Sequence, residues 1–412
     1  MRKDKKGIGM NKIGRRTFLK YAGAVGVSAS LGGFPNVIRA QSKKILLGIS
    51  SDVTGVMAPE GRAQKDGYIL AIEEWNKKGG IGRQKIEYIE RNHGGDPVRA
   101  SGNAKLFVES GCCAAYGGSY STAGIAEMKV FAPAQIPMIG GCAALAVFQS
   151  GPDGKIYFFS HSGADWALGK AGVAWAAWAG HKKIAVLHLN VAWPRDIRDI
   201  HLEWIKKEYG PKHGLQCIKT IEADVKATDL TPQAAELKAL NPDAIICDIY
   251  SGASAALARA FADLDYHPPW TNYWSAAEAV WMKGDPKLLY NHTGYSYASG
   301  IREDTLAKKK EFIERFGYEP VAHWVAGYDG ANLTLRAIKE VGPNSIAIRD
   351  WLAKKAYGIP VLAGRKGNVC HYRDVEETWL GKTGTFYSLY EGTDYAFVRV
   401  DKEGKLNWFD IQ

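Results

Sequence analysis

The chain has 412 residues, 46% of them hydrophobic, and a formal net charge of +10. Its composition is that of an ordinary globular protein, and its length favours two domains, since single hydrophobic cores rarely exceed about 300 residues. Residues 1–40 hold nine of the 53 Lys and Arg residues and one acid, so the remaining 44 basic and 42 acidic residues exclude a basic nucleic-acid-binding surface.

The first forty residues predict an export signal. Arg15 and Arg16 are followed by Thr, Phe, Leu and Lys, which resembles the twin-arginine signal, although Gly14 departs from the pattern. A mildly apolar run at 21–34 follows, too short to span a bilayer permanently. We expect cleavage after Ala40, export through the twin-arginine translocase, and a mature chain that is soluble in the periplasm.

From Ile45 onward, short apolar runs alternate with helical patterns. This alternation predicts a parallel sheet with helices on both faces, because parallel strands need long crossovers. The predicted strands are 45–49, 85–89, 112–116 and 136–139, and the predicted helices are 63–76, 97–109 and about 121–133.

The same alternation restarts after a Gly-rich passage and predicts a second parallel sheet. Here the predicted strands are 184–188, 215–221 and 244–249, between helices at 165–179, 196–207, 232–240 and 253–264. The C-terminal part predicts a strand at 293–298, helices at 303–316, 321–341 and 346–356, and strand-like runs at 387–390, 395–400 and 405–409 around a hairpin turn at 401–404. Two such domains usually leave a cleft at the carboxyl ends of their strands.

One loop stands out as a candidate anion site. Gly117 and Gly118 follow the third strand, and Ser121 or Thr122 can cap the next helix through its side-chain oxygen. A helix N-terminus offers unpaired N–H groups and partial positive charge, which suits a small carboxylate. The alternative is that these hydroxyls cap the helix and bind nothing.

The chain shows no recognisable catalytic or metal-binding pattern. Its six cysteines lack CxxC spacing and are expected to be buried small hydrophobes, with one disulfide still possible. No HExxH, GxSxG or Gly-rich nucleotide motif occurs. We therefore predict a non-enzymatic protein without a metal or cofactor; an exported redox enzyme is a less favoured alternative.

Several motifs in order resemble a known family. The Ser/Thr-Gly loop at 54–61, the run Asn76-Lys-Lys-Gly-Gly-Ile-Gly and the pair Asp96-Pro97 are similar to the periplasmic leucine/isoleucine/valine-binding proteins, the type I solute-binding proteins of ABC importers. The resemblance implies an α/β fold of two doubly wound parallel-sheet domains joined by three hinge crossings. The implied division is a signal at 1–40, one lobe at 43–162 plus 298–375, and a second lobe at 163–297 plus 376–412, with crossings near 160–164, 295–300 and 373–385.

The resemblance also implies which residues bind a solute. The family's carboxylate-binding serine matches Ser121, and its cleft aromatics match Trp193 and Tyr250. An acidic partner for a ligand ammonium is expected just after Trp270, where the chain has Trp274, or Glu278 with a shift of four residues. The full predicted set is Tyr120, Ser121, Thr122, Cys142, Ala143, Ala144, Trp193, Tyr250, Trp274 and Glu278.

Because Trp274 stands where the family has an acidic residue, the sequence does not decide the identity of the solute. A buried ammonium needs a carboxylate partner, and the other candidates are Asp248 and Glu60. An aromatic box of Trp193, Tyr250 and Trp274 would instead suit a flat or apolar acid. The expected partners are a small organic solute, either an amino acid or an amino-less carboxylate, and a membrane permease with its ATPase; the chain itself is expected to be a monomer. A ligand-sensing receptor for amides or amino acids is the alternative.

Overall fold

The computed structural model describes residues 44–273, 284–390, 394–409 and 411. The predicted signal residues Arg15 and Arg16, and the predicted site residues Trp274 and Glu278, lie outside the described residues. Within the described ranges, no helix combines the length and apolar character that crossing a membrane would require.

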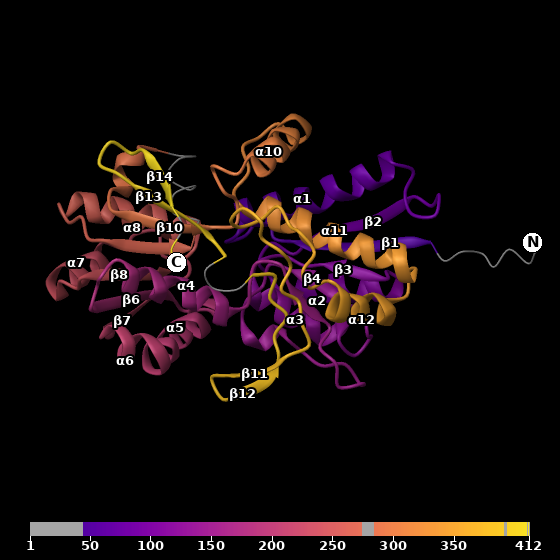
Figure 1. Ribbon diagram of the computed structural model, residues 1–412, viewed down its shortest axis with the longest axis horizontal. Coiled ribbons are helices and arrows are strands. Elements are labelled where there is room, and N and C mark those ends of the chain that lie inside the picture. Colours follow the sequence, from indigo (N-terminus) through magenta and orange to yellow (C-terminus); the bar gives the residue numbers. More distant parts are fainter. Residues whose placement is uncertain (1–43, 274–283, 391–393, 410, 412) are drawn as a thin grey trace, which may run out of the picture. The chain divides into compact units, whose positions relative to one another are not determined.

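The first sheet contains five parallel strands in the order β2-β1-β3-β4-β5 (Figure 1). Helix α1 packs against α11, and α2 packs against α3. We call these strands, together with α1–α3 and α10–α12, the first-sheet region. Its strands are β1 Ile45–Ser51, β2 Ile86–Asn92, β3 Ala114–Tyr116, β4 Met138–Gly140 and β5 Phe158–Ser160, and its helices are α1 Ala58–Lys77, α2 Pro97–Glu109, α3 Ser121–Phe131, α10 Glu303–Phe316, α11 His323–Val341 and α12 Ser345–Lys355.

The second sheet has the order β14-β13-β10-β9-β8-β6-β7. Its strands are parallel except β13, which pairs antiparallel with both β10 and β14. We call this sheet, with α4–α8, the second-sheet region. Its strands are β6 Lys183–Leu189, β7 Gln216–Ala223, β8 Ala244–Asp248, β9 Trp270–Tyr273, β10 His292–Ser296, β13 Ala396–Val400 and β14 Leu406–Phe409, and its helices are α4 Asp165–Trp178, α5 Ala192–Trp204, α6 Gly210–His213, α7 Thr231–Leu240 and α8 Ser251–Asp263.

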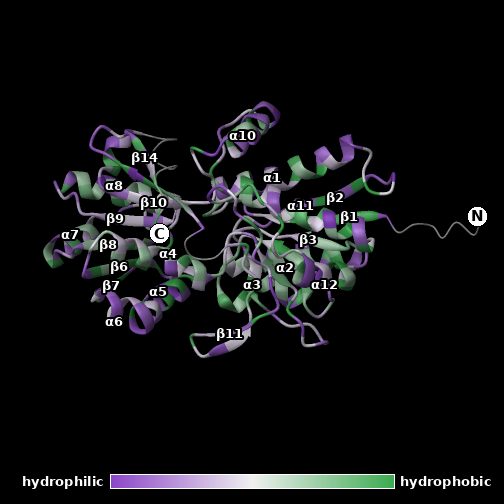
Figure 2. Cartoon of the chain, viewed as in Figure 1, coloured by the Kyte–Doolittle hydropathy of each residue, from purple (hydrophilic) through white to green (hydrophobic). Residues whose placement is uncertain are grey.

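Local sequence explains where the helices begin and end. The Asp96 side chain accepts hydrogen bonds from the backbone N–H groups of Val98 and Arg99 and so caps α2, with Pro97 at its first position. Helix α10 ends at Gly317, which has a φ of 73°. Figure 2 colours much of α10 as hydrophilic, and only Thr305 and Phe312 of this helix are buried.

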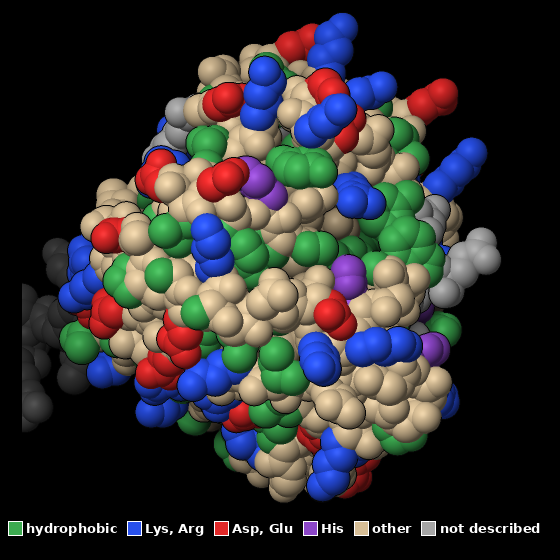
Figure 3. Space-filling model, turned by 90° about the vertical axis from the view of Figure 1, so that its left-hand side faces the viewer, with side chains coloured by type: hydrophobic (Ala, Val, Ile, Leu, Met, Phe, Trp, Pro, Cys, Tyr) green, Lys and Arg blue, Asp and Glu red, His purple; other side chains and the backbone are tan. Residues whose placement is uncertain are grey.

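The surface of the second-sheet region mixes both charge signs. Figure 3 shows Lys and Arg interspersed with Asp and Glu on the displayed face. Arg195, for example, forms a two-pronged pair with Glu222 at 2.8 and 2.9 Å. All six cysteines lie within the described residues, where each is free and only Cys217 is not fully buried.

The C-terminal segment differs from its prediction. Residues 387–390 form no strand; Ser388 makes only an isolated bridge to Ser160. The hairpin of β13 and β14 around Gly404, with a φ of 82°, is confirmed. The sequence did not predict a second hairpin, formed by β11 (Glu376–Trp379) and β12 (Lys382–Thr385), which joins neither large sheet.

The tip of this β11–β12 hairpin contacts the second-sheet region, and the segment that follows its base contacts the first-sheet region. Beside its base, the Tyr387 ring stacks on Phe159 of β5 at 4.4 Å, and Arg349 of α12 donates to the Tyr387 hydroxyl at 2.7 Å. At its tip, Trp379 packs against Trp166 of α4 and Trp204 of α5, with ring centroids 6.2 and 5.0 Å apart. The Leu380 backbone N–H donates to Glu203 Oε2 at 3.0 Å.

Candidate functional site

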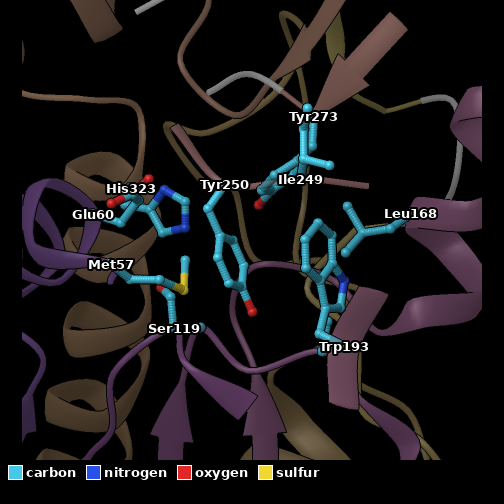
Figure 4. Close-up of a pocket in the computed structure, with 11 residues that line it drawn as sticks. Met57, Glu60, Ser119, Leu168, Trp193, Ile249, Tyr250, Tyr273 and His323 are labelled. Atoms are coloured by element: carbon cyan, nitrogen blue, oxygen red, sulfur yellow. The ribbon is translucent and has the colours of Figure 1, made fainter. Parts of the chain in front are cut away.

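A small pocket is lined by loops and helix ends from both sheet regions (Figure 4). Its volume is about 20 Å³, which is near that of a single water molecule. Any organic solute would therefore require its walls to separate or its side chains to rearrange. The lining residues are Met57, Glu60, Ser119, Gly141, Ala143, Leu168, Trp193, Ile249, Tyr250, Tyr273 and His323.

The first charged group of the pocket is Glu60. It lies in the first turn of α1 and is fully buried. Its Oε1 accepts a hydrogen bond from the hydroxyl of Ser251, the first residue of α8, whereas Oε2 has no hydrogen-bond partner among the described residues. Burial raises the pKa of the Glu60 carboxyl above its usual value, while its bond to Ser251 acts in the opposite direction. This bond joins the first-sheet region to the second-sheet region.

Ser119 is held by a buried glutamine beneath the pocket floor. The Ser119 hydroxyl donates to Gln64 Oε1. Gln64, which is fully buried in α1, donates through Nε2 to the Gly117 carbonyl at 2.7 Å. Ser119 therefore has a fixed orientation set by a residue that does not line the pocket.

Tyr68 and His161 belong to the same hydrogen-bond network as Gln64. Gln64 Nε2 lies 2.8 Å from His161 Nε2, and Tyr68 donates to the Gly117 carbonyl at 2.9 Å. Burial lowers the pKa of His161 to about 3, so the ring is neutral near pH 7 and can act as a hydrogen-bond acceptor. The polar floor of the pocket thus carries no positive charge from this network.

Aromatic side chains of the second-sheet region form the opposite wall. The Trp193 ring of α5 stacks on Tyr250 with centroids 5.7 Å apart and an interplanar angle of 19°. Tyr273, at the end of β9, lies 5.9 Å from Trp193. In Figure 4 the Tyr250 ring lies between Glu60, Met57 and Ser119 on one side and Trp193 on the other. Such a wall favours flat or apolar groups and also cations.

Three of the predicted site residues line this pocket, namely Ala143, Trp193 and Tyr250. The others that are described do not line it. Ser121 is 1% exposed, and its Oγ accepts hydrogen bonds from the backbone N–H groups of Ala143 at 3.2 Å and Ala144 at 3.4 Å. Tyr120 instead packs edge-on against Tyr250 at 6.3 Å.

The prediction that Ser121 or Thr122 caps α3 is wrong. Ser121 is itself the first residue of the helix, Tyr120 occupies the capping position, and no side chain caps α3. The helix begins one residue earlier than the capping pattern requires, so the Ser121 hydroxyl points to the next loop. That loop includes Cys142, whose fully buried thiol donates to the Gly118 carbonyl at 3.2 Å.

Some of the other lining residues are partly indicated by sequence patterns. Ser119 lies in the loop after β3, which is the predicted anion site, two positions before the predicted ligand Ser121. Glu60 was considered only as an alternative partner for an ammonium. Nothing in the sequence pointed to His323, because α11 reaches the pocket from a distant part of the chain.

Comparison with known proteins identifies the family. Residues 44–374 match the sequence profile of a family described as periplasmic binding protein. The chain belongs to the periplasmic binding protein family. Its α/β fold with two parallel-sheet domains is that of a type I periplasmic binding protein, as predicted. Membership in a family of binding proteins also confirms the prediction that the chain is a solute-binding protein and not an enzyme.

Solved structures of periplasmic binding proteins share this fold at low sequence identity. LivJ from Streptococcus pneumoniae, in complex with isoleucine, is 18% identical with a TM-score of 0.69, and the match covers 90% of this chain and 99% of LivJ. A fatty acid ABC transporter substrate-binding protein from Thermomonospora curvata is 19% identical with a TM-score of 0.70, covering 90% and 92%. A solute-binding protein from R. palustris, in complex with benzoate, is 17% identical with a TM-score of 0.69, covering 89% and 96%.

Proposed function

We propose that this protein is the exported substrate-binding component of an ABC importer and captures a small organic solute between its two sheet regions. The observation that carries this proposal is the composition of the pocket walls. Glu60 and Ser119 come from the first-sheet region, and Trp193 and Tyr250 come from the second. A solute that contacts both walls binds the closed form better than the open form and so drives closure.

The division into two moving lobes remains a proposal that the backbone contacts support. We propose lobes at 43–162 plus 298–375 and at 163–297 plus 376–412, with crossings near 160–164, 295–300 and 373–385. The Ser160 N–H donates to the Tyr387 carbonyl at 3.0 Å, and the Leu389 N–H donates to the Ser160 carbonyl at 2.9 Å. Two distant chain segments therefore run together next to the first proposed crossing.

The related structures support a small organic solute without identifying it. They bind isoleucine or benzoate, or are named for fatty acids. We propose that Trp193 and Tyr250 receive the apolar body of the solute, and that Glu60, Ser119 and the Ala143 backbone contact its polar end. Ser121, Thr122, Tyr120, Cys142 and Ala144 then shape the loops behind these contacts, and Trp274 and Glu278 are further candidates outside the described residues.

The same proposal includes export of the protein and delivery of its solute to a permease. We infer that residues 1–40, with Arg15 and Arg16, direct export through the twin-arginine translocase to the periplasm. There the closed, solute-loaded protein would meet a permease and its ATPase at the inner membrane.

The test is a thermal-shift and calorimetric screen with amino acids, aromatic acids, short carboxylates and their amides. A solute at 100 times its dissociation constant adds about 2.7 kcal/mol to the free energy of unfolding. Trp193→Ala should weaken binding of any hit by at least about tenfold, because it removes one aromatic wall. Trp178→Ala is the matched control, since Trp178 is 56% exposed and outside the pocket. Equal losses of affinity in Trp193→Ala and Trp178→Ala would contradict the proposal. So would a solute that makes neither variant more compact when it is added.

A further inference from the structure

The hydrogen-bond polarity of the pocket floor follows from the orientation of Gln64. A backbone carbonyl can only accept, so the 2.7 Å contact with the Gly117 carbonyl requires the Gln64 amide nitrogen on that side. The amide oxygen must then face Ser119. The Ser119 hydroxyl donates to this oxygen.

This donation decides what Ser119 can offer to a solute. A serine hydroxyl has one hydrogen and two lone pairs. Because the hydrogen is engaged with Gln64, only the lone pairs remain for the pocket. Ser119 is therefore an acceptor there, which suits an N–H group and does not suit a carboxylate.

Glu60 presents a second acceptor on the same wall. Its Oε2 is fully buried and lacks a partner in the described part of the chain, although Glu60 lines the pocket. The carboxyl group lies in the first turn of α1 and accepts from Ser251 at the start of α8, so two helix N-termini oppose the burial that raises its pKa. An unpartnered buried carboxylate is stabilised when a donor reaches it.

The remaining pocket walls also favour a solute group that donates hydrogen bonds over a carboxylate. Among the described lining residues there is no lysine or arginine that could neutralise a carboxylate. The stacked rings of Trp193 and Tyr250 can attract a cation through their faces. Trp193 Nε1 is buried and makes no hydrogen bond within the described residues, which leaves one donor for an acceptor at the far end of a solute.

We propose that the wall formed by Glu60 and Ser119 recognises a nitrogen that donates hydrogen bonds, either an ammonium or a primary amide, and that a solute whose only polar end is a carboxylate is discriminated against. This inference rests on the proposed function and specifies its solute class. It reverses the expectation that the loop after β3 receives a carboxylate.

The experiment compares matched solutes by calorimetry on the purified protein. The pairs are benzamide with benzoate, isovaleramide with isovalerate, and L-leucine with isocaproate. We expect the nitrogen-bearing member of at least one pair to bind at least about tenfold more tightly than its partner, since each lost charge-assisted or buried hydrogen bond costs about that factor. Among nitrogen-bearing solutes, preference for leucine identifies an ammonium head and preference for an amide identifies an amide head.

Two variants assign the effect to this wall. Glu60→Gln keeps the shape and removes the charge, so it should weaken an ammonium-bearing solute by at least about tenfold and an amide by less. Ser119→Ala should weaken both kinds, with the melting temperature recorded to exclude unfolding. Glu127→Gln is the matched control, because Glu127 is an equally buried glutamate in α3 that does not line the pocket.

The outcomes separate this inference from the proposed function. If at least one solute binds and no pair favours its nitrogen-bearing member by about tenfold, the inference is overturned and solute capture still stands. Unchanged affinity of Glu60→Gln for the nitrogen-bearing solute would have the same consequence. Absence of binding by every member of all three pairs, together with no hit in the wider screen, would overturn both.

Discussion

The β11–β12 hairpin allows a direct test of how the two sheet regions are held together. Its tip residue, Trp379, is 9% exposed and packs between Trp166 and Trp204, while the Lys207 ammonium lies 4.8 Å from its ring centroid. Its base is fixed to the first-sheet region through Tyr387 and Arg349. Trp379→Ala removes the contact at the tip and leaves the base intact.

The magnitude follows from the buried area. A tryptophan buries about 150–250 Å², which at about 25 cal/mol/Å² corresponds to an upper limit of about 4–6 kcal/mol. The alanine retains a small part of this area, and the hairpin can undock while both sheets stay folded. We therefore expect a loss of about 3 kcal/mol of docking free energy. If the closed form requires the docked hairpin, this loss weakens solute affinity by up to about 100-fold.

Hydrogen exchange and calorimetry together measure the effect. In Trp379→Ala the backbone amides of the hairpin should exchange faster, with the amides of β1 and β8 unchanged, and small-angle scattering should show a more open average. Tyr357→Ala serves as control, since Tyr357 is 55% exposed and lies outside the hairpin. Unchanged hairpin protection and unchanged affinity in Trp379→Ala would refute the reasoning that the hairpin bridges the two regions energetically.

Three further predictions concern the site and its support. Ser121→Ala should lower the free energy of unfolding by about 1–3 kcal/mol, because the buried N–H groups of Ala143 and Ala144 lose their acceptor; urea denaturation measures this, and an unchanged midpoint would contradict it. Burial raises the pKa of Glu60, so its carboxylate takes up a proton at a higher pH than an ordinary glutamate; calorimetry from about pH 8 down to about pH 5 should show ammonium affinity falling, and a flat profile would argue against Glu60 as the acceptor. A Cβ at Gly61 would lie 1.9 Å from the Asp52 carbonyl oxygen, so Gly61→Ala should cost about 2 kcal/mol or more by thermal unfolding, and a wild-type melting temperature would show that this contact relaxes.

Most of the fold could be predicted because its elements carry local patterns. The cap at Asp96 and the glycine at 317 define α2 and α10 at the predicted residues. Strands β5 and β9, with three and four residues, were missed; the equally short β3 and β4 were predicted from apolar runs that alternate with helical patterns. Residues 387–390 resemble a strand, but their rings are buried on several sides by other aromatics, so the apolar run reflects packing and not pairing.

Family resemblance pointed to some of the residues that line the pocket, and the residues placed there by tertiary contacts were not predicted. Trp193 and Tyr250, which the resemblance places in the cleft, both line the pocket, and their role in binding a solute stays a prediction. Ser121 was predicted as a residue that caps α3, but the helix begins at Ser121 and its hydroxyl accepts from the backbone of Ala143 and Ala144. The polarity of Ser119 depends on Gln64 and Gly117, and no local pattern connects these residues.

The free cysteines bear on the export through the twin-arginine translocase that we propose. Each cysteine of the described chain is free, so no disulfide holds the described fold together. Under the proposed export route, the chain would fold in a reducing cytosol, where disulfides are rare, before it crosses the membrane. That order of events is the one that a translocase for folded cargo requires.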